Sequence, residues 1–435
     1  MTAGAEWPGA AEYAAWYARF AEAVANTPRE EAGEPLRAEL HRYLEAFLRA
    51  SGAAAPDGLG THRLRSLLTP LLERLEAEYQ AFARSPVVLA SMQQAVATTA
   101  VLPSPAIDPL AKALHTLSHG WGLPAQTTPR IEVWREGTTR LYRYGVAGRG
   151  SGPALVLLYA QINRPSILDL EPGHSLVEGL VAAGRDVYLL DWGDPAPEDH
   201  DRTLAQWLHG RLHRAIRAVA GRRKVDLLGI CQGGVFALLY TATHPARVRR
   251  LVTMVTPVDF QVSDDLVSLW ARACGPAAVH DGHGVSGAAL NVFFQMLAPF
   301  RQGVGKYLDL LDHLGDPQWV QRFRRMERWV HDCPDPPREV LRAFLADLYR
   351  DNALVRGTLQ LDGRPVDLAR IHVPLLNLYG VNDHIVPPAA SRALCGLTAS
   401  RRYEEWALPV GHIGVFVSDR AAAVPTRIAA WLDRR

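Results

Sequence analysis

The chain has 435 residues, of which 48% are apolar and 21% are charged. Its length exceeds that of one typical domain, and its composition is that of a globular protein with a sizeable core rather than of a disordered chain. The formal net charge is +2 and Lys and Arg form no concentrated run, so there is no electrostatic basis for nucleic-acid binding.

Signals for export, membrane insertion and metal binding are missing from the sequence. No apolar run has the length of a membrane span, and the first six residues lack both a basic n-region and an apolar h-region. The cysteines are widely scattered and form no C-x-x-C pair, so we expect neither a disulfide framework nor a metal site. They are Cys231, Cys274, Cys333 and Cys395. A reducing cytoplasm is the expected compartment.

The first hundred residues have the pattern of helices. Apolar residues recur at helical spacing in three stretches, 13–24, 36–48 and 64–82. Turn-forming residues separate these stretches at 26–28, 51–60 and 85–86. The pattern predicts an N-terminal helical region over residues 1–100, either a structural appendage or a module that docks a partner or a surface.

After the Pro-Ser-Pro segment at 103–105 the pattern becomes that of an α/β protein. An antiparallel pair is predicted at 131–134 and 140–144, with its turn at 136–138. Short buried runs then alternate with helical stretches, which predicts a mostly parallel sheet covered on both faces. These runs are 154–159, 186–190, 225–228, 251–255 and 375–379. We expect one catalytic domain over residues 101–435.

Residues 229–234, Gly-Ile-Cys-Gln-Gly-Gly, have the form of the nucleophile elbow of α/β-hydrolases, with Cys231 as the nucleophile. A predicted strand precedes them and a predicted helix follows, as an elbow requires. The turn is too tight for side chains at Gly229 and Gly233, and the helix N-terminus favours a thiolate over a thiol. Cysteine at this position favours acyl transfer between thioesters over plain ester hydrolysis. The other three cysteines lack an elbow and are interpreted as small apolar side chains.

Between about residues 261 and 350 the alternation stops, and helical stripes rich in aromatic residues replace it. An insertion at this point of an α/β-hydrolase usually forms a cap over the active site. We expect most of its aromatic side chains to pack against one another and some to line an apolar acyl channel.

An elbow cysteine needs a base, and the base needs an orienting carboxylate. In α/β-hydrolases both follow the nucleophile in the chain, the acid first. Asp383 lies just past the predicted strand 375–379, and His412 lies between two glycines ahead of an apolar helix. Alone, Asp383 fits a turn residue and His412 an ordinary loop histidine. Their joint order predicts that His412 takes the proton of Cys231 while Asp383 holds the imidazole.

The oxyanion of the tetrahedral intermediate needs two backbone donors. One should be the N–H of Gln232, the residue after the nucleophile, and the second should come from the loop after the first long strand. That loop spans residues 160–165, and Ile162 is the candidate for its donor. Asn163 either positions a water or substrate oxygen or caps the loop. Loss of one such donor typically costs about 3 to 4 kcal/mol of transition-state stabilisation.

Several segments, the elbow included, resemble the polyhydroxyalkanoate synthases, most closely those of the two-subunit, class III type. The segments are 159–165, 167–170, 187–193, 229–234, 251–260, 383–384 and 411–414, and the resemblance covers about residues 101–435. It implies an α/β-hydrolase fold with a mobile cap. It also implies polymerisation of (R)-3-hydroxyacyl-CoA, here 3-hydroxybutyryl-CoA, into polyester with release of CoA through a cysteinyl acyl-enzyme. The family's catalytic triad corresponds to Cys231, Asp383 and His412.

The resemblance also implies partners. The CoA thioester is the substrate and no cofactor is expected. The growing polyester chain and the surface of cytoplasmic polyhydroxyalkanoate granules are expected partners, together with a second copy of the chain in a homodimer. Class III enzymes have a second, helical subunit. The N-terminal helical region here is longer than in a class III catalytic subunit, so it either replaces that subunit, docks it or binds the granule.

Two other functions fit the same residues. A thioesterase or acyltransferase of the α/β-hydrolase fold would use the same nucleophile, and the thioesterase would release free acid instead of polymer. A non-catalytic granule-associated protein is the third alternative, and an intact Cys-Asp-His set argues against it.

Overall fold

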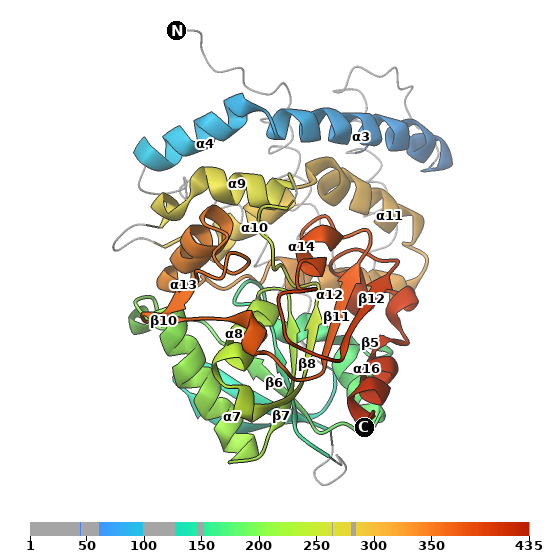
Figure 1. The fold of residues 1–435 in the computed structure, drawn as a ribbon. Coiled ribbons are helices and arrows are strands. Elements are labelled where there is room, and N and C mark those ends of the chain that lie inside the picture. The colour runs from blue at the N-terminus through green and yellow to red at the C-terminus, as the bar shows by residue number, and fades with distance from the viewer. Residues whose placement is uncertain are drawn as a thin grey trace. The chain divides into compact units, whose positions relative to one another are not determined.

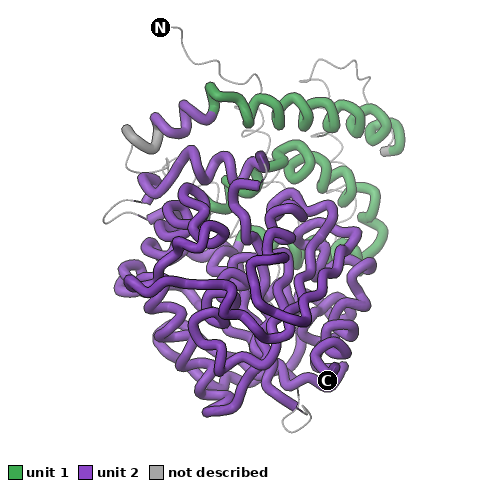
Figure 2. The backbone as a smooth tube through the Cα atoms, viewed as in Figure 1, with its two compact units in different colours: residues 1–88, 104–123, 288–331 green, residues 89–103, 124–287, 332–435 purple. Residues whose placement is uncertain are grey.

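The computed structural model describes residue 44 and residues 61–98, 127–145, 152–262, 264–279 and 284–434. The chain divides into two compact units (Figure 2). The first comprises residues 1–88, 104–123 and 288–331, and the second comprises residues 89–103, 124–287 and 332–435. The predicted stretches 13–24 and 36–48 lie almost wholly outside the described residues, as does the predicted boundary near residue 101. The assignment of separate domains at that boundary therefore stays a prediction.

The second unit is built on an eight-stranded sheet (Figure 1). The first two strand pairs in the spatial order, β1–β2 and β2–β6, are antiparallel, and all the others are parallel. The spatial order of the strands is β1 (Arg130–Glu136), β2 (Thr139–Tyr144), β6 (Val187–Asp191), β3 (Leu155–Leu158), β7 (Val225–Ile230), β8 (Val248–Met254), β11 (Leu375–Gly380) and β12 (Tyr403–Leu408). The predicted hairpin and all five predicted buried strands are confirmed.

The central strands are covered on both faces. Every residue of β3 and β7 is buried, as expected for parallel strands between two layers of helices. On one face Trp207 and Phe236 pack edge-on against Trp192, with ring centroids 5.5 and 5.6 Å away. The flanking helices of this unit are α6 (Leu176–Ala182), η3 (Gln206–Leu212), α7 (His213–Ala220), α8 (Gln232–Thr243), α14 (Pro388–Arg392), α15 (Gly414–Val417) and α16 (Val424–Asp433).

The described residues between β8 and β11 are mostly helical, with one small hairpin. The helices are α9 (Leu266–Cys274), η5 (Pro276–Ala278), α10 (Gly287–Gln295), η6 (Arg301–Gly305), α11 (Lys306–Asp312), α12 (Pro317–Val330), α13 (Arg338–Ala343), η7 (Phe344–Arg350) and η8 (Leu368–Arg370). The hairpin joins β9 (Gln360–Leu361) to β10 (Arg364–Pro365), and a second hairpin earlier in the chain joins β4 (Asp169–Glu171) to β5 (His174–Ser175). The loss of strand pattern from about residue 261 to residue 350 thus corresponds to helices.

The first unit contains the helix α3 (Thr61–Ala83), and α4 (Pro86–Thr98) follows it. Leu64, Leu68 and Tyr79 of the predicted apolar stripe are buried, whereas Phe82 is exposed. Within this unit the hydroxyl of Tyr79 donates to the carbonyl oxygen of Met296 at 2.7 Å. The helix α3 is therefore held to the helical segment that follows α10. No helix in the described part of the chain is both long and apolar enough to span a membrane.

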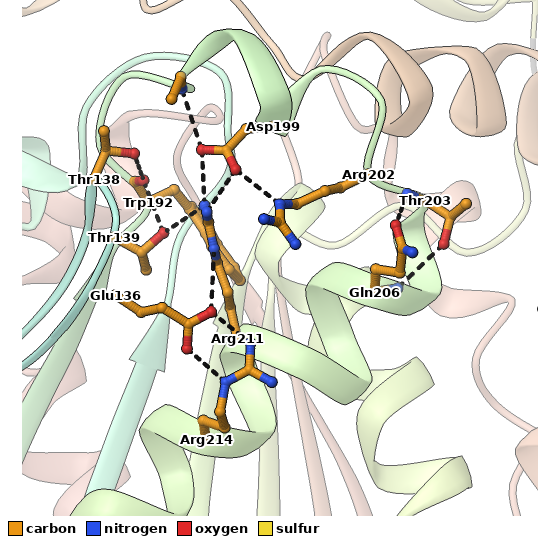
Figure 3. Close-up of polar contacts among 11 residues, drawn as sticks. Glu136, Thr138, Thr139, Trp192, Asp199, Arg202, Thr203, Gln206, Arg211 and Arg214 are labelled. Atoms are coloured by element: carbon orange, nitrogen blue, oxygen red, sulfur yellow. Dashed lines mark hydrogen bonds and ion pairs between the residues drawn. The ribbon is translucent and has the colours of Figure 1, made fainter.

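A buried ion pair fixes the turn of the β1–β2 hairpin next to the carboxyl end of β6 (Figure 3). The Arg211 guanidinium, on η3, donates to both oxygens of Asp199 at 2.5 and 3.0 Å and to the Thr139 hydroxyl at 3.3 Å. Thr139 in turn donates to the carbonyl oxygen of Trp192 at 3.1 Å. A charge removed from water needs a paired, hydrogen-bonded partner, and Asp199 supplies it to both terminal nitrogens of Arg211. The network holds three separate segments at this corner of the sheet.

Candidate active site

Cys231 lies between β7 and α8 in a strained backbone conformation. Its φ is 53° and its ψ is −123°, a region that residues other than glycine rarely adopt. Two hydrogen bonds of 2.9 Å hold it there: its N–H donates to the carbonyl oxygen of Met254, and its own carbonyl oxygen accepts from the N–H of Gly234. The side chain is half-buried. This is the strand–turn–helix geometry of a nucleophile elbow.

The two glycines that the sequence marked as sterically required occupy crowded positions. A Cβ on Gly229 would lie 2.6 Å from the carbonyl oxygen of Gly233, and a Cβ on Gly233 would lie 2.1 Å from that of Leu158. Both neighbours are backbone atoms, which cannot move aside as a side chain can. The predicted steric requirement is confirmed, and it brings the end of β3 against the elbow.

Asp383 and His412 are brought together from the loops after β11 and β12. The Nδ1 atom of His412 lies 2.7 Å from Oδ2 of Asp383, and both side chains are buried. The other carboxylate oxygen of Asp383 accepts from the backbone N–H groups of Ile385 and Val386, at 2.9 and 2.8 Å. Asp383 is thus oriented by its own loop and uses its remaining oxygen to hold the imidazole.

The electrostatics of His412 connect it to both partners. Burial lowers the pKa of the imidazole, but the negative charges of Asp383 and Cys231 and hydrogen bonds to both side chains outweigh burial and raise that pKa to about 10. His412 therefore lies within hydrogen-bonding reach of the Cys231 sulfur and carries a proton at neutral pH. An imidazolium beside a sulfur stabilises a thiolate.

The backbone N–H groups of Gln232, the first residue of α8, and of Ile162, in the β3 loop (residues 160–165), are without a partner among the described residues. The N–H of Gln161 is not available, because it donates to Oε1 of the Gln232 side chain at 2.8 Å. Asn163 has a φ of 59°, and its backbone N–H donates to the sulfur of Cys333. The two unpartnered groups are the ones that the sequence indicated as oxyanion donors.

Two tyrosines near Cys231 were not identified from the sequence. Burial raises the pKa of Tyr159 and of Tyr349, and the charge of Cys231 raises both further. Tyr159 directly follows β3 and Tyr349 belongs to η7, near the end of the long helical insertion. A tyrosine at a strand end is a weak signal, and no local pattern could have placed Tyr349 here.

The remaining cysteines occupy three different environments. Cys274 is buried, as expected of a small apolar side chain, and burial raises the pKa of its thiol to about 11. Cys333 is half-buried and accepts the N–H of Asn163. Cys395 is exposed, so its interpretation as an apolar filler was wrong. In the described ranges, no cluster of three or more His, Cys, Asp or Glu side chains is arranged to hold a metal ion.

Residues 153–419 match the family model of the alpha/beta hydrolase fold. The chain is 42% identical over 334 residues to the poly(3-hydroxyalkanoate) polymerase subunit PhaC of Allochromatium vinosum, an alignment that covers 75% of this chain and 94% of that protein. It is 39% identical to the protein of the same name from Thiocystis violacea, with the same coverage. The Synechocystis protein of that name is 40% identical over 321 residues, or 71% of this chain and 85% of the relative.

Proposed function

Because this chain belongs to the alpha/beta hydrolase fold family and, within it, to the poly(3-hydroxyalkanoate) polymerases, we propose that it polymerises (R)-3-hydroxyacyl-CoA, with 3-hydroxybutyryl-CoA as the substrate, and releases CoA. The observation that carries this proposal is the position of Cys231. Its sulfur stands on a strained elbow beside an imidazole that a buried carboxylate orients.

The first step is acylation of Cys231. The thiolate attacks the thioester carbon of the acyl-CoA, a new carbon–sulfur bond forms, and the bond to the CoA sulfur breaks. His412, protonated at neutral pH, gives its proton to the departing CoA thiolate. One thioester replaces another, so the step is nearly isoenergetic and needs no cofactor.

The oxyanion formed during this attack requires donors that are already in place. The free N–H groups of Gln232 and Ile162 flank the elbow and support that role. Asn163, two residues after Gln161 in the same loop, is the candidate for positioning the substrate's oxygen. Its backbone N–H is engaged with Cys333, so this role falls to its side chain.

Chain extension reverses the direction of proton transfer. Acylation removes the charge of Cys231, which is one of the causes that raise the pKa of His412. The neutral imidazole then accepts the proton of a 3-hydroxyl group, whose oxygen attacks the cysteinyl thioester. The ester bond forms, the bond from the acyl carbon to the Cys231 sulfur breaks, and the sulfur leaves as the thiolate. Asp383 keeps the imidazole in the required tautomer throughout.

Water must be kept from the acyl-enzyme, because hydrolysis would end the chain. We assign this task to the later part of the helical insertion, α13 and η7, which belongs to the same unit as Cys231. In support, Tyr349 of its last helix lies close enough to Cys231 for the charge of the sulfur to raise the tyrosine pKa.

Partners follow from the same proposal. The product is an insoluble polyester, so the enzyme works at the surface of its own granule in the cytoplasm and holds the growing chain. Relatives at 39 to 42% identity are named as polymerase subunits, which supports assembly with another subunit. We propose that this subunit is helical and that two copies of the present chain form the core of the assembly. The N-terminal helical region either takes the place of that subunit, docks it or binds the granule.

The decisive assay follows free CoA and turbidity together, with 3-hydroxybutyryl-CoA as the substrate and with or without a helical partner subunit. Polymerisation gives CoA release with insoluble product. CoA release with soluble 3-hydroxybutyrate would instead identify a thioesterase. Cys231→Ala should abolish acylation and Cys231→Ser should leave weak activity, while Cys395→Ala, at an exposed cysteine, should match the wild type. Acyl label on any other cysteine would refute the assignment.

A further inference from the structure

The side chain of Gln232 makes a hydrogen bond that joins the two halves of the proposed oxyanion hole. Its Oε1 accepts the backbone N–H of Gln161 at 2.8 Å. Both residues are buried, with 6% of Gln232 and 3% of Gln161 exposed. This is the one hydrogen bond that the Gln161 N–H makes among the described residues.

The bond restricts what the β3 loop can do. Gln161 is fixed to the first residue of α8, and Asn163, with its φ of 59°, is fixed through its N–H to the sulfur of Cys333. The N–H between these two attachments, that of Ile162, is the one left open. A donor stabilises a developing oxyanion only if it is held in place before the reaction.

We propose that the side chain of Gln232 is a positioning residue, which holds the β3 loop so that the N–H of Ile162 and the N–H of Gln232 itself converge on the same oxygen. This rests on the proposed acyl transfer at Cys231. One residue thus supplies the first donor from its backbone and fixes the second through its side chain.

The far end of the loop has its own attachment. Arg164 donates to Asp194 at 2.6 Å and to Asp332 at 2.9 Å. With the loop anchored there, loss of the Gln232 contact should displace Ile162 without unfolding the loop. The expected effect is therefore smaller than the roughly 10²- to 10³-fold loss that follows removal of an oxyanion donor.

The test variant is Gln232→Met, which keeps the size of the side chain and the backbone N–H but removes the carbonyl oxygen. We expect kcat for CoA release from 3-hydroxybutyryl-CoA to fall by about 10- to 100-fold with KM within about twofold, because only the transition state loses stabilisation. Gln360→Met makes the same chemical change at an exposed position of β9 and should match the wild type. Gln232→Asn, whose oxygen is one methylene short of Gln161, serves if Gln232→Met does not fold.

Two further measurements separate positioning from a merely structural role. Hydrogen exchange at the Gln161 amide should lose its protection in Gln232→Met. Butyryl-CoA lacks the 3-hydroxyl and stops after acylation, so the carbonyl stretch of its acyl-enzyme can be recorded by infrared difference spectroscopy. That stretch should move to higher wavenumber in the variant as its polarisation weakens.

The outcomes distinguish this inference from the function on which it rests. If the wild type forms an acyl-enzyme at Cys231 and Gln232→Met shows the same kcat, the same carbonyl stretch or the same Gln161 protection, the positioning role is wrong and the polymerase assignment stands. If the wild type is not acylated at Cys231, the proposed function itself fails.

Discussion

At Gly234 the elbow helix α8 closely approaches the residues that follow β8. A Cβ at this position would lie 1.8 Å from Oγ1 and 2.6 Å from Cγ2 of Thr256. Thr256 is fully buried, its hydroxyl lies 3.2 Å from the carbonyl oxygen of Met254, and it follows Val255, whose φ is 44°. A side chain held in this way cannot rotate away without losing a hydrogen bond in the core.

Gly234→Ala is therefore expected to destabilise the protein, against the trend of helix propensity. In an unconstrained helix the change from glycine to alanine stabilises by about 1 kcal/mol. Overpacking a core costs about 1 to 3 kcal/mol, and the contacts here are severe, so the clash should prevail. The matched control is Gly210→Ala in η3, where a Cβ would meet only the flexible guanidinium of Arg214, at 3.4 Å or more. That change should be neutral or stabilising.

The assay is urea unfolding followed by tryptophan fluorescence, together with the acylation rate. Thr256→Ala removes the two closest atoms, including the one at 1.8 Å, and leaves the Cβ at 2.7 Å, so it should relieve part of the clash. The double variant should then be less destabilised than the sum of the two single changes by about 0.5 to 3 kcal/mol. Additive effects of Gly234→Ala and Thr256→Ala, or a Gly234→Ala protein as stable as the wild type, would refute this account of the elbow.

Three more outcomes follow from buried charges. Cys231→Ala should lower the pKa of His412 from about 10, as measured from its ring resonances by NMR. In the wild type, the free energy of unfolding that protonated His412 contributes is fully present below about pH 6.5 and is lost as the pH rises through the folded-state pKa. Asp199→Ala removes the closest partner of the buried Arg211 guanidinium and leaves it the Glu136 carboxylate at 3.7 Å and the Thr139 hydroxyl at 3.3 Å; it should cost about 3 kcal/mol by denaturation, the low end for a broken buried pair. Burial opposes ionisation of Glu327, but the ammonium of Lys306 and the imidazole of His331 together outweigh burial and lower the carboxyl pKa to about 2. The contribution of ionised Glu327 to the free energy of unfolding is thus present above about pH 4.3 and is lost as the pH falls toward 2. Glu327→Gln should not show this loss.

The strands and the elbow were predictable because their signals are local. A run such as Leu155–Leu158 is short and apolar at every position, which is typical of a strand buried on both faces. The elbow needs glycine at two positions for steric reasons that operate over a few residues. Asp383 and His412 were found by their order relative to Cys231, since parallel strands bring the loops after them to one edge.

The strand β12 was missed because its residues carry little of that pattern. It lies at the edge of the sheet and pairs with β11 alone. Four of its six residues, Tyr403 to Trp406, are only partly buried, and Leu408 alone is buried. Glu404 and Glu405 therefore remain compatible with a strand, although they break the apolar run by which the central strands were recognised.

Contacts between residues far apart in the chain could not be predicted from the sequence, for a different reason. Gln232 fits the elbow motif at any value of its side-chain torsions, and only the path of the β3 loop brings Gln161 within its reach. The same holds for Tyr349, which is 118 positions after Cys231 in the numbering of the chain. Such pairs depend on how the elements pack, and no spacing rule encodes them.

The geometry of the site is set by the register of three adjacent parallel strands. Ile230, Met254 and Leu378 stand side by side at the carboxyl ends of β7, β8 and β11. Just past this row, the N–H of Cys231 donates to the carbonyl oxygen of Met254 and the N–H of Val255 donates to that of Leu378, at 2.9 and 2.8 Å.

Both donors in this row, Cys231 and Val255, have positive φ angles, 53° and 44°. The N–H of each strained residue is thus bonded to the next strand, and β11 leads directly to the loop of Asp383. Strain of this kind persists where the surrounding structure determines the backbone more than once. The distance from the sulfur to the His412–Asp383 pair is therefore a property of the sheet edge, so a substitution that shifts β8 against β7 should disturb catalysis even if it touches none of the three side chains.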